Sequence, residues 1–174
     1  PMNIGVIGLG TGSLSAWGRP QDRFCFYELD PLVTQVARDY FTYVQENEVE
    51  IVNGDGRIEL ERELLEQGPR QYDILFIDAF SSDSIPVHLL TTECLELYRQ
   101  HLKPDGVLVL HITNKFVDLR PVAHSLARQL GWQSVLLDHD NRDTDSDTRW
   151  VVLTRNAKLA NSPRFQQARR SEEH

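Results

Sequence analysis

The chain has 174 residues, of which 40% are hydrophobic and 25% charged, and its formal net charge is −8. This composition is ordinary for a globular protein, and no apolar stretch reaches the roughly 20 residues of a membrane helix. The acidic balance argues against nucleic acid as a partner and mildly favours a cationic substrate. We therefore expect a soluble, cytoplasmic chain without direct membrane contact, in which Cys25 and Cys94 are core residues.

Strand-like apolar runs alternate with helix-like stretches, the pattern of a parallel sheet that is covered on both faces. The first five strands are predicted at residues 3–8, 23–29, 49–53, 73–78 and 106–112. The clearest helical patterns between and after them begin at Pro31, cover residues 93–102 and cover residues 119–130. The predicted fold class is therefore α/β.

Two last strands are predicted at residues 134–138 and 149–154, and only a short, polar, Asp-rich stretch separates them. A parallel crossover normally needs a dozen or more residues, usually helical, so we expect an antiparallel hairpin. A mostly parallel, seven-stranded sheet with a reversed final strand is typical of the Rossmann-like S-adenosylmethionine-dependent transferases. We assign residues 1–155 to this nucleoside-binding domain and residues 156–174 to a polar C-terminal tail.

Closely spaced glycines, Gly8, Gly10 and Gly12, follow the first strand. Glycines at such a turn let backbone N–H groups approach a ligand where a Cβ would collide. The dinucleotide fingerprint requires a further glycine where Ser13 stands, so the pattern fits a nicotinamide cofactor poorly. The motif predicts a nucleoside-binding turn, and a tight turn without a ligand is the alternative.

Two acids, Glu28 and Asp30, follow the second strand and lie on the same side of it. A carboxylate at this place, about 20 residues beyond the glycines, holds the ribose hydroxyls in folds of this kind. We prefer Glu28 because it lies nearer the strand end. Asp30 precedes Pro31 and is explained as a favourable negative charge at a helix N-terminus.

A third acidic turn, Gly54-Asp55-Gly56, follows the third strand. The Asp55 carboxylate can accept hydrogen bonds from the exocyclic amine of adenine, and Gly56 lets the ring lie close. An ordinary Asp-Gly turn is the alternative explanation.

The expected reaction centre follows the fourth strand, because ligands bind at the carboxyl ends of strands in an open parallel sheet. Asp78 ends that strand and is the candidate catalytic residue, and Asp83 lies in the loop that follows. Asn114, just past the fifth strand, reaches the same edge and is a candidate acceptor ligand together with Asp83. His111 is expected to be a histidine with satisfied hydrogen bonds near the site. No metal is expected, since the histidines lack ligand spacing.

These motifs resemble those of the polyamine aminopropyltransferases, of which spermidine synthase is the type member, over nearly the whole chain. The closest likeness is to a spermidine synthase-like branch that is often fused to membrane-spanning segments and has the loop Asp-Ala-Phe-Ser-Ser-Asp, as in residues 78–83. The resemblance implies Glu28 on the ribose, Asp55 on the adenine and Asp78 on the attacking amine. It also implies decarboxylated S-adenosylmethionine as donor, a polyamine such as putrescine as acceptor, a membrane-tethered parent protein and a homodimer.

Two departures from the family pattern keep other functions open. Thr11 stands where the family has an aspartate that helps to hold the aminopropyl end of the donor, which motivates a methyltransferase that uses S-adenosylmethionine. Nothing in the chain matches the family's N-terminal β-rich, amine-binding segment, which motivates a non-catalytic nucleoside-binding module. The absence of a methionine at position 1 suggests an excised domain.

Overall fold

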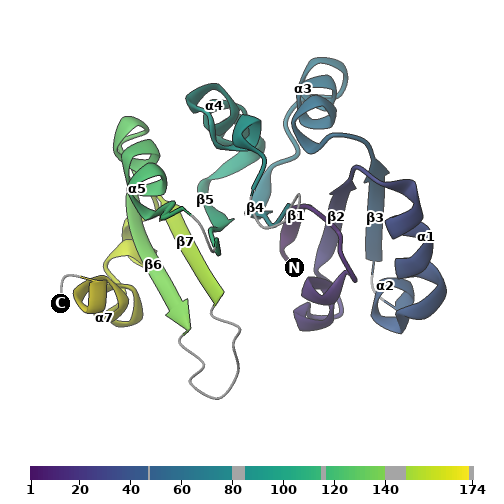
Figure 1. The fold of residues 1–174 in the computed structure, drawn as a ribbon, viewed down its shortest axis with the longest axis horizontal. Coiled ribbons are helices and arrows are strands. Elements are labelled where there is room, and N and C mark those ends of the chain that lie inside the picture. Colours follow the sequence, from purple (N-terminus) through teal and green to yellow (C-terminus); the bar gives the residue numbers. More distant parts are fainter. Residues whose placement is uncertain (47, 80–84, 115–116, 140–147, 173–174) are drawn as a thin grey trace.

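The computed structural model describes residues 1–46, 48–79, 85–114, 117–139 and 148–172 (Figure 1). Its strands form a seven-stranded sheet and are β1 (Asn3–Ile7), β2 (Arg23–Glu28), β3 (Glu48–Asn53), β4 (Tyr72–Ile77), β5 (Leu102–His111), β6 (Gln133–His139) and β7 (Thr148–Thr154). Its helices are η1 (Ser13–Trp17), α1 (Pro31–Tyr40), α2 (Thr42–Glu46), α3 (Gly56–Glu66), η2 (Val87–Leu90), α4 (Thr92–His101), α5 (Arg120–Gln129), α6 (Ala157–Ala160) and α7 (Pro163–Glu172).

The strand order is β3-β2-β1-β4-β5-β7-β6. Strands β1 to β5 are parallel, whereas β7 is antiparallel to both of its neighbours, β5 and β6. The Rossmann-like α/β fold with a reversed final strand is thus confirmed. The reversal follows from the short connection between β6 and β7, which leaves no room for a helical crossover.

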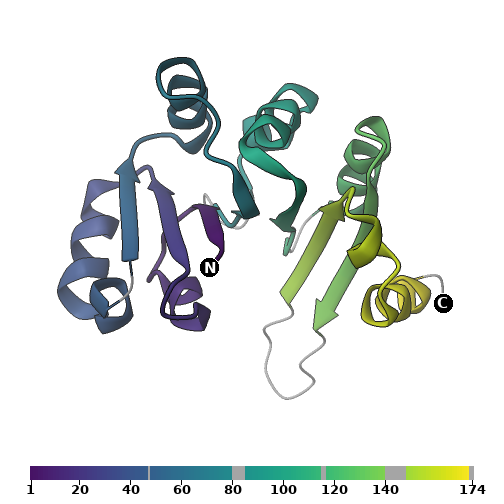
Figure 2. The ribbon, with the colours of Figure 1, turned by 180° about the vertical axis from the view of Figure 1, so that it is seen from behind.

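Helices cover the two faces of the sheet in two groups. Helices α3, α4 and α5 lie on one face, and α1, α2 and α7 lie on the other (Figures 1 and 2). The order of the strands changes direction at β1, because the chain moves from β1 to β2 and β3 on one side and then returns to β4 on the other. This change of direction opens a crevice at the carboxyl ends of β1 and β4, where open sheets bind ligands.

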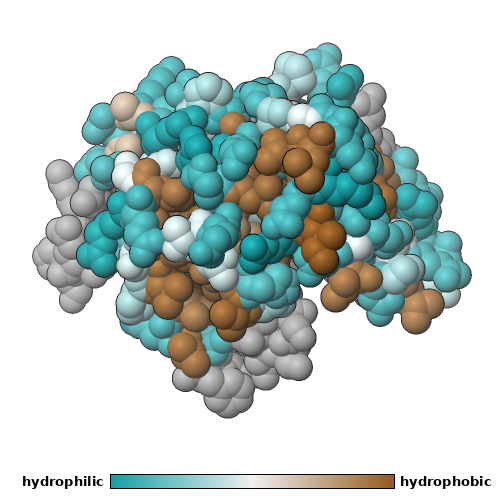
Figure 3. Space-filling model, turned by 90° about the horizontal axis from the view of Figure 1, so that it is seen from above, coloured by the Kyte–Doolittle hydropathy of each residue, from teal (hydrophilic) through white to brown (hydrophobic). Residues whose placement is uncertain are grey.

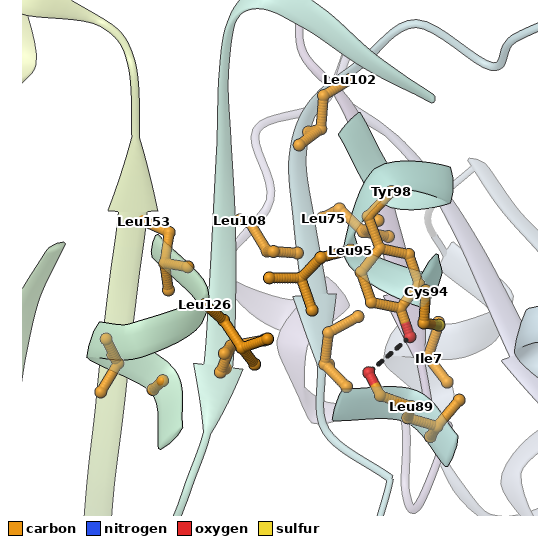
Figure 4. Close-up of a cluster of buried hydrophobic side chains, with 14 of the residues drawn as sticks. Ile7, Leu75, Leu89, Cys94, Leu95, Tyr98, Leu102, Leu108, Leu126 and Leu153 are labelled. Carbon is orange, nitrogen blue, oxygen red and sulfur yellow. Dashed lines mark hydrogen bonds between the residues drawn. The ribbon is translucent and has the colours of Figure 1, made fainter. Parts of the chain in front are cut away.

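The main core lies between the sheet and helices α4 and α5. Leu75 of β4 and Leu108 of β5 pack with Leu95 and Tyr98 of α4 (Figure 4), and all four side chains are at most 1% exposed. The Tyr98 hydroxyl donates a hydrogen bond to the Leu89 carbonyl over 3.3 Å, which ties α4 to η2. Cys25 and Cys94 are also buried, as expected.

Strand β5 begins earlier than the sequence predicts. It starts at Leu102, opposite Tyr72, and its register with β4 then shifts before Ile74 pairs with Val107. The residues in between include Pro104, which has no N–H to donate to a ladder. Residues 103–105, which precede the predicted strand, are therefore accommodated as an irregularity within β5.

The segment after residue 155 is helical where the structure describes it. Asn156 caps α6 through a hydrogen bond from Leu159 N–H to its side chain, and Phe165 of α7 is buried against Val135 of β6. The division of the chain at residue 155 stays a prediction, but α7 packs on the sheet rather than fraying. The sequence of α7 shows no helical apolar pattern, because few of its residues are apolar.

The surface over α3, α4 and α5 is mixed in polarity. Apolar residues gather there in separate patches between hydrophilic ones (Figure 3). Among the described helices, none combines the length and the apolar character that crossing a membrane requires.

Candidate functional site

A cavity of about 450 Å³ lies at the carboxyl ends of β1, β2, β3 and β4. Its lining includes Gly8, Gly10, Glu28, Asp55 and Asp78, so the structure brings together the acids that follow three different strands. These residues are far apart in the sequence and meet because the parallel strands end at one edge.

A larger hollow, of about 1030 Å³, lies at the opposite edge of the sheet. Its lining includes Asn3, Arg23 and Arg70, at or near the starts of strands. We place the site in the smaller cavity, because the acidic and glycine motifs converge there and because ligands of open parallel sheets bind at the carboxyl ends.

The glycine turn leaves β1 in a conformation that other residues rarely adopt. Gly8 has φ +99°, and a Cβ at this position would lie 2.4 Å from the Asp78 carbonyl oxygen. Gly10 has φ +52° and open space around it. Gly12 is not in the cavity lining that the structure describes, and it approaches Val44 of α2. Gly8 and Gly10 therefore border the cavity, whereas Gly12 closes the turn behind it.

Glu28 is held in place at the end of β2 by two backbone groups. Its Oε2 accepts a hydrogen bond from Leu9 N–H at 3.0 Å, and its Oε1 accepts one from Asp30 N–H at 2.9 Å. An ionised carboxylate has about four acceptor sites, so acceptor capacity remains for hydroxyl groups of a ligand. The contact with Leu9 also fixes Glu28 against the glycine turn.

Asp30 has the helix-capping role that the sequence indicates. Its Oδ1 accepts a hydrogen bond from Leu32 N–H at 2.9 Å at the start of α1, with Pro31 in the first turn. This satisfies one of the unpaired donors of the helix N-terminus. The structure thus confirms the capping role of Asp30, while the contact of Glu28 with a ribose stays a prediction.

Asp55 begins a helix that the sequence analysis missed. Its Oδ1 accepts hydrogen bonds from Arg57 N–H at 3.0 Å and Ile58 N–H at 3.2 Å, which caps α3. Its Oδ2 contacts His88 Nε2 at 3.0 Å. Gly56 is needed for packing, since a Cβ there would lie 2.7 Å from Ile7 Cγ2. The Asp-Gly pair is therefore a helix start beside the cavity rather than a simple turn.

Asp78 is in contact with the histidine that ends β5. Its Oδ1 lies 2.6 Å from His111 Nδ1, and His111 Nε2 lies 2.8 Å from Thr113 Oγ1. The imidazole stacks on Trp150 of β7, with ring centroids 4.0 Å apart and an interplanar angle of 10°. The expected hydrogen-bonded histidine is thus a direct partner of the candidate catalytic aspartate.

The structure does not place either of the two candidate acceptor ligands, Asp83 and Asn114, in the described lining of the cavity. Asp83 lies outside the residues that the structure describes. Asn114 follows β5, and its Oδ1 accepts a hydrogen bond from Val117 N–H at 2.9 Å. It is not among the described residues that line the cavity. A role for either residue in acceptor binding stays a prediction.

A buried polar network joins β2 and β4 of the sheet to α3. The Tyr27 hydroxyl contacts Glu63 Oε2 at 2.7 Å and the Tyr72 hydroxyl at 2.8 Å. Arg70 pairs with Glu63 and with Glu50 on the surface. Burial acts to raise the pKa of Glu63, but the hydrogen bonds from Arg70 and Tyr27 outweigh it and hold that pKa below its usual value.

Metal-binding clusters do not appear in the described ranges, where no three His, Cys, Asp or Glu residues are grouped so that they could hold an ion. The polar groups of the cavity are instead carboxylates, glycine backbone and one histidine.

Comparison with known proteins shows which proteins the chain is similar to. No protein-family model matches it. A polyamine aminopropyltransferase of Vibrio vulnificus is 37% identical over 123 residues, which are 68% of this chain and 40% of that protein. Over its matched part, this chain is similar to the polyamine aminopropyltransferases. A second aminopropyltransferase, a probable one of Bifidobacterium longum, is 27% identical over 62% of this chain and 23% of its own length. The chain thus spans less than half of the length of either relative.

Methyltransferases are also similar to this chain. The eEF1A lysine and N-terminal methyltransferase of Xenopus laevis is 30% identical over 66% of this chain and 18% of its own length. The structure of human Methyltransferase-like protein 13 in complex with SAH has a TM-score of 0.75 and 20% identity, covering 99% of this chain and 81% of that one. A probable spermidine synthase from Corynebacterium glutamicum has a TM-score of 0.74 and 22% identity, covering 97% and 62%. At these identities the two structures show a shared fold.

Proposed function

We propose that this chain is the nucleoside-binding domain of an aminopropyltransferase, which moves an aminopropyl group from decarboxylated S-adenosylmethionine to a polyamine such as putrescine. The charge of the cavity is the observation that carries the proposal. Its described lining holds three carboxylates, Glu28, Asp55 and Asp78, and no lysine or arginine. The donor carries a sulfonium and an ammonium, and the acceptor is also cationic, so this cavity attracts both.

The same charge disfavours a donor that retains its carboxylate. The methionyl carboxylate of S-adenosylmethionine finds no lysine or arginine side chain in the described lining. Burying a charged group without a partner is costly. The decarboxylated donor avoids this cost, because only cationic groups accompany its adenosine.

Each part of the donor has a matching group in the proposed complex. Glu28 accepts hydrogen bonds from the ribose hydroxyls, and Asp55 accepts one from the adenine amine in place of its contact with His88. The turn at Gly8 and Gly10 lets the sulfonium end approach the backbone. Gly12 and Gly56 contribute indirectly, by shaping the turn and by letting α3 pack on β1.

The transfer step requires mainly correct positioning of the reactants. The acceptor nitrogen attacks the aminopropyl carbon that is bonded to sulfur. The new C–N bond forms as the C–S bond breaks, and the electron pair of that bond goes to sulfur, which leaves as a neutral thioether. A polyamine ammonium with a pKa of about 10 must lose a proton first. Asp78 attracts this ammonium, and its carboxylate or solvent takes the proton.

A methyltransferase is the second candidate, and two observations favour it. Thr11 stands where the aminopropyltransferases carry an aspartate for the aminopropyl end of the donor, and methyltransferases are among the similar sequences. The same cavity could present S-adenosylmethionine, whose methyl group would then be transferred. The two candidates differ in which donor binds more tightly.

Calorimetry with both donors separates these candidates, using the longest natural protein that contains this chain. We expect the decarboxylated donor to bind at least about tenfold more tightly, the factor that corresponds to 1.4 kcal/mol. Radiolabelled transfer to putrescine should be lost in Asp78→Asn and kept in Asp39→Asn, an exposed control on α1. Tighter binding of S-adenosylmethionine with methyl transfer would overturn the proposal. Donor binding without any transfer would instead indicate a binding module.

A further inference from the structure

The candidate catalytic carboxylate is the last member of a chain of hydrogen bonds that begins on β7. Arg149 N–H donates to Thr113 Oγ1 at 2.8 Å. Thr113 Oγ1 lies 2.8 Å from His111 Nε2, and His111 Nδ1 lies 2.6 Å from Asp78 Oδ1. Neither Thr113 nor Arg149 lines the cavity within the described residues. The chain therefore connects Asp78 to groups that do not meet a ligand in the cavity.

The chemistry of these groups sets the direction of the hydrogen bonds. An ionised carboxylate only accepts, so His111 Nδ1 carries the proton that is shared with Asp78. The other nitrogen of a neutral imidazole is then an acceptor. Thr113 Oγ1 already accepts from a backbone N–H, and its own proton is available to donate to His111 Nε2. Every donor thus points toward Asp78.

Burial and stacking hold the imidazole in this orientation. The His111 side chain is 16% exposed and the Asp78 side chain 30%. Trp150 stacks on the imidazole, and Phe76 contacts the edge of Trp150 with ring centroids 6.2 Å apart. Within the part of the chain that the structure describes, Asp78 Oδ2 has no hydrogen-bond partner. The bond from His111 therefore fixes one oxygen and leaves the other for the cavity.

We propose that His111 is a positioning residue for Asp78 and that the Thr113 hydroxyl, by donating to His111 Nε2, holds the imidazole in the orientation and tautomer that the carboxylate requires. The proposal deepens the proposed function and rests on it, because it assumes that Asp78 meets the acceptor amine. Of the charged residues on the neighbouring strands, Asp78 faces the imidazole from the end of β4. Arg149 of β7 takes part through its backbone N–H.

Two pairs of variants test this role in the full-length protein. Thr113→Val removes the hydroxyl at nearly constant shape and should lower kcat roughly fivefold, the factor for one net hydrogen bond, while Thr113→Ser should restore most of it. His111→Asn keeps an N–H donor near the Nδ1 position and should retain more activity than His111→Ala. Donor affinity should stay unchanged in all four.

A matched control is His124→Asn, because His124 Nδ1 bonds Ser134 Oγ at 2.8 Å on α5 and β6, outside the described cavity lining. This control should leave kcat unchanged. Equal kcat values for Thr113→Val, Thr113→Ser and the wild type would overturn the positioning role.

Nitrogen-15 NMR of the imidazole gives a readout that needs no substrate. The wild type should show the His111 proton on Nδ1 at neutral pH, and Thr113→Val should change the Nε2 resonance, because that nitrogen loses its hydrogen-bond donor while the proton stays on Nδ1. A proton on Nε2 in the wild type would overturn the inference even if transfer is observed. An Nδ1 proton in a protein that transfers nothing would instead contradict the proposed function and leave the hydrogen-bond chain intact.

Discussion

Replacing Glu28 by glutamine tests whether this carboxylate, rather than Asp30, holds the ribose. The change is nearly isosteric but removes the charge and one acceptor oxygen. In the structure both oxygens already accept a backbone N–H, from Leu9 at 3.0 Å and from Asp30 at 2.9 Å. A glutamine can satisfy only one of these donors, because its NH₂ group faces the other.

The magnitude follows from the hydrogen bonds at stake. A hydrogen bond to a charged group contributes about 1.5–3 kcal/mol. The loss of one such bond to a ribose hydroxyl weakens binding by roughly 10- to 150-fold. Asp30→Asn should change the affinity little, because asparagine is as good a helix cap as aspartate and because Asp30 caps α1 through Leu32 N–H.

The assay is calorimetry with 5′-methylthioadenosine and with its 2′-deoxy analogue. The wild type should bind the deoxy analogue more weakly, and Glu28→Gln should bind the two ligands with nearly equal affinity, because the partner of the hydroxyl is gone. The reasoning is refuted if Glu28→Gln still distinguishes the two ligands as the wild type does, or if Asp30→Asn loses the distinction instead.

Three further predictions concern the stability of the fold and the glycine turn of the site. Asp55→Ala should lower the free energy of unfolding by about 1 kcal/mol through loss of the α3 cap, and Asp55→Ser should not, as urea denaturation will show. Arg70→Met should cost about 3 kcal/mol, because it leaves the buried Glu63 carboxylate unpaired. Since the pKa of Glu63 is lowered, its stabilisation is present above the usual glutamate pKa and is lost as the pH falls through the lowered value. Urea midpoints measured against pH should therefore lose this acid limb in Arg70→Met. Gly8→Ala should abolish donor binding in calorimetry, whereas Gly68→Ala, also at positive φ but in open space, should affect only stability.

Much of the fold could be predicted from local pattern. Apolar runs located the strands to within a few residues. The exception is β5, which begins earlier than predicted and contains Pro104 in an irregular stretch where its register with β4 shifts. The short link between β6 and β7 was enough to predict the reversed strand, because chain length alone excludes a helical crossover. The convergence of Glu28, Asp55 and Asp78 was also predictable, because parallel strands end at one edge.

The partners of these acids could not be predicted in the same way. The contact of His88 with Asp55 depends on how η2 lies over the cavity, and nothing in the sequence around His88 indicates it. The burial of Phe165 against Val135 likewise depends on packing between distant elements.

The sequence by itself determined which residues stand at the ends of the strands, because strand periodicity and chain connectivity are local properties. Only the tertiary structure decided that His111 of β5 reaches Asp78 of β4, with Trp150 of β7 stacked upon it. That contact depends on the register between strands and on the insertion of β7 beside β5. Both are set by the packing of the whole sheet, which no local pattern encodes.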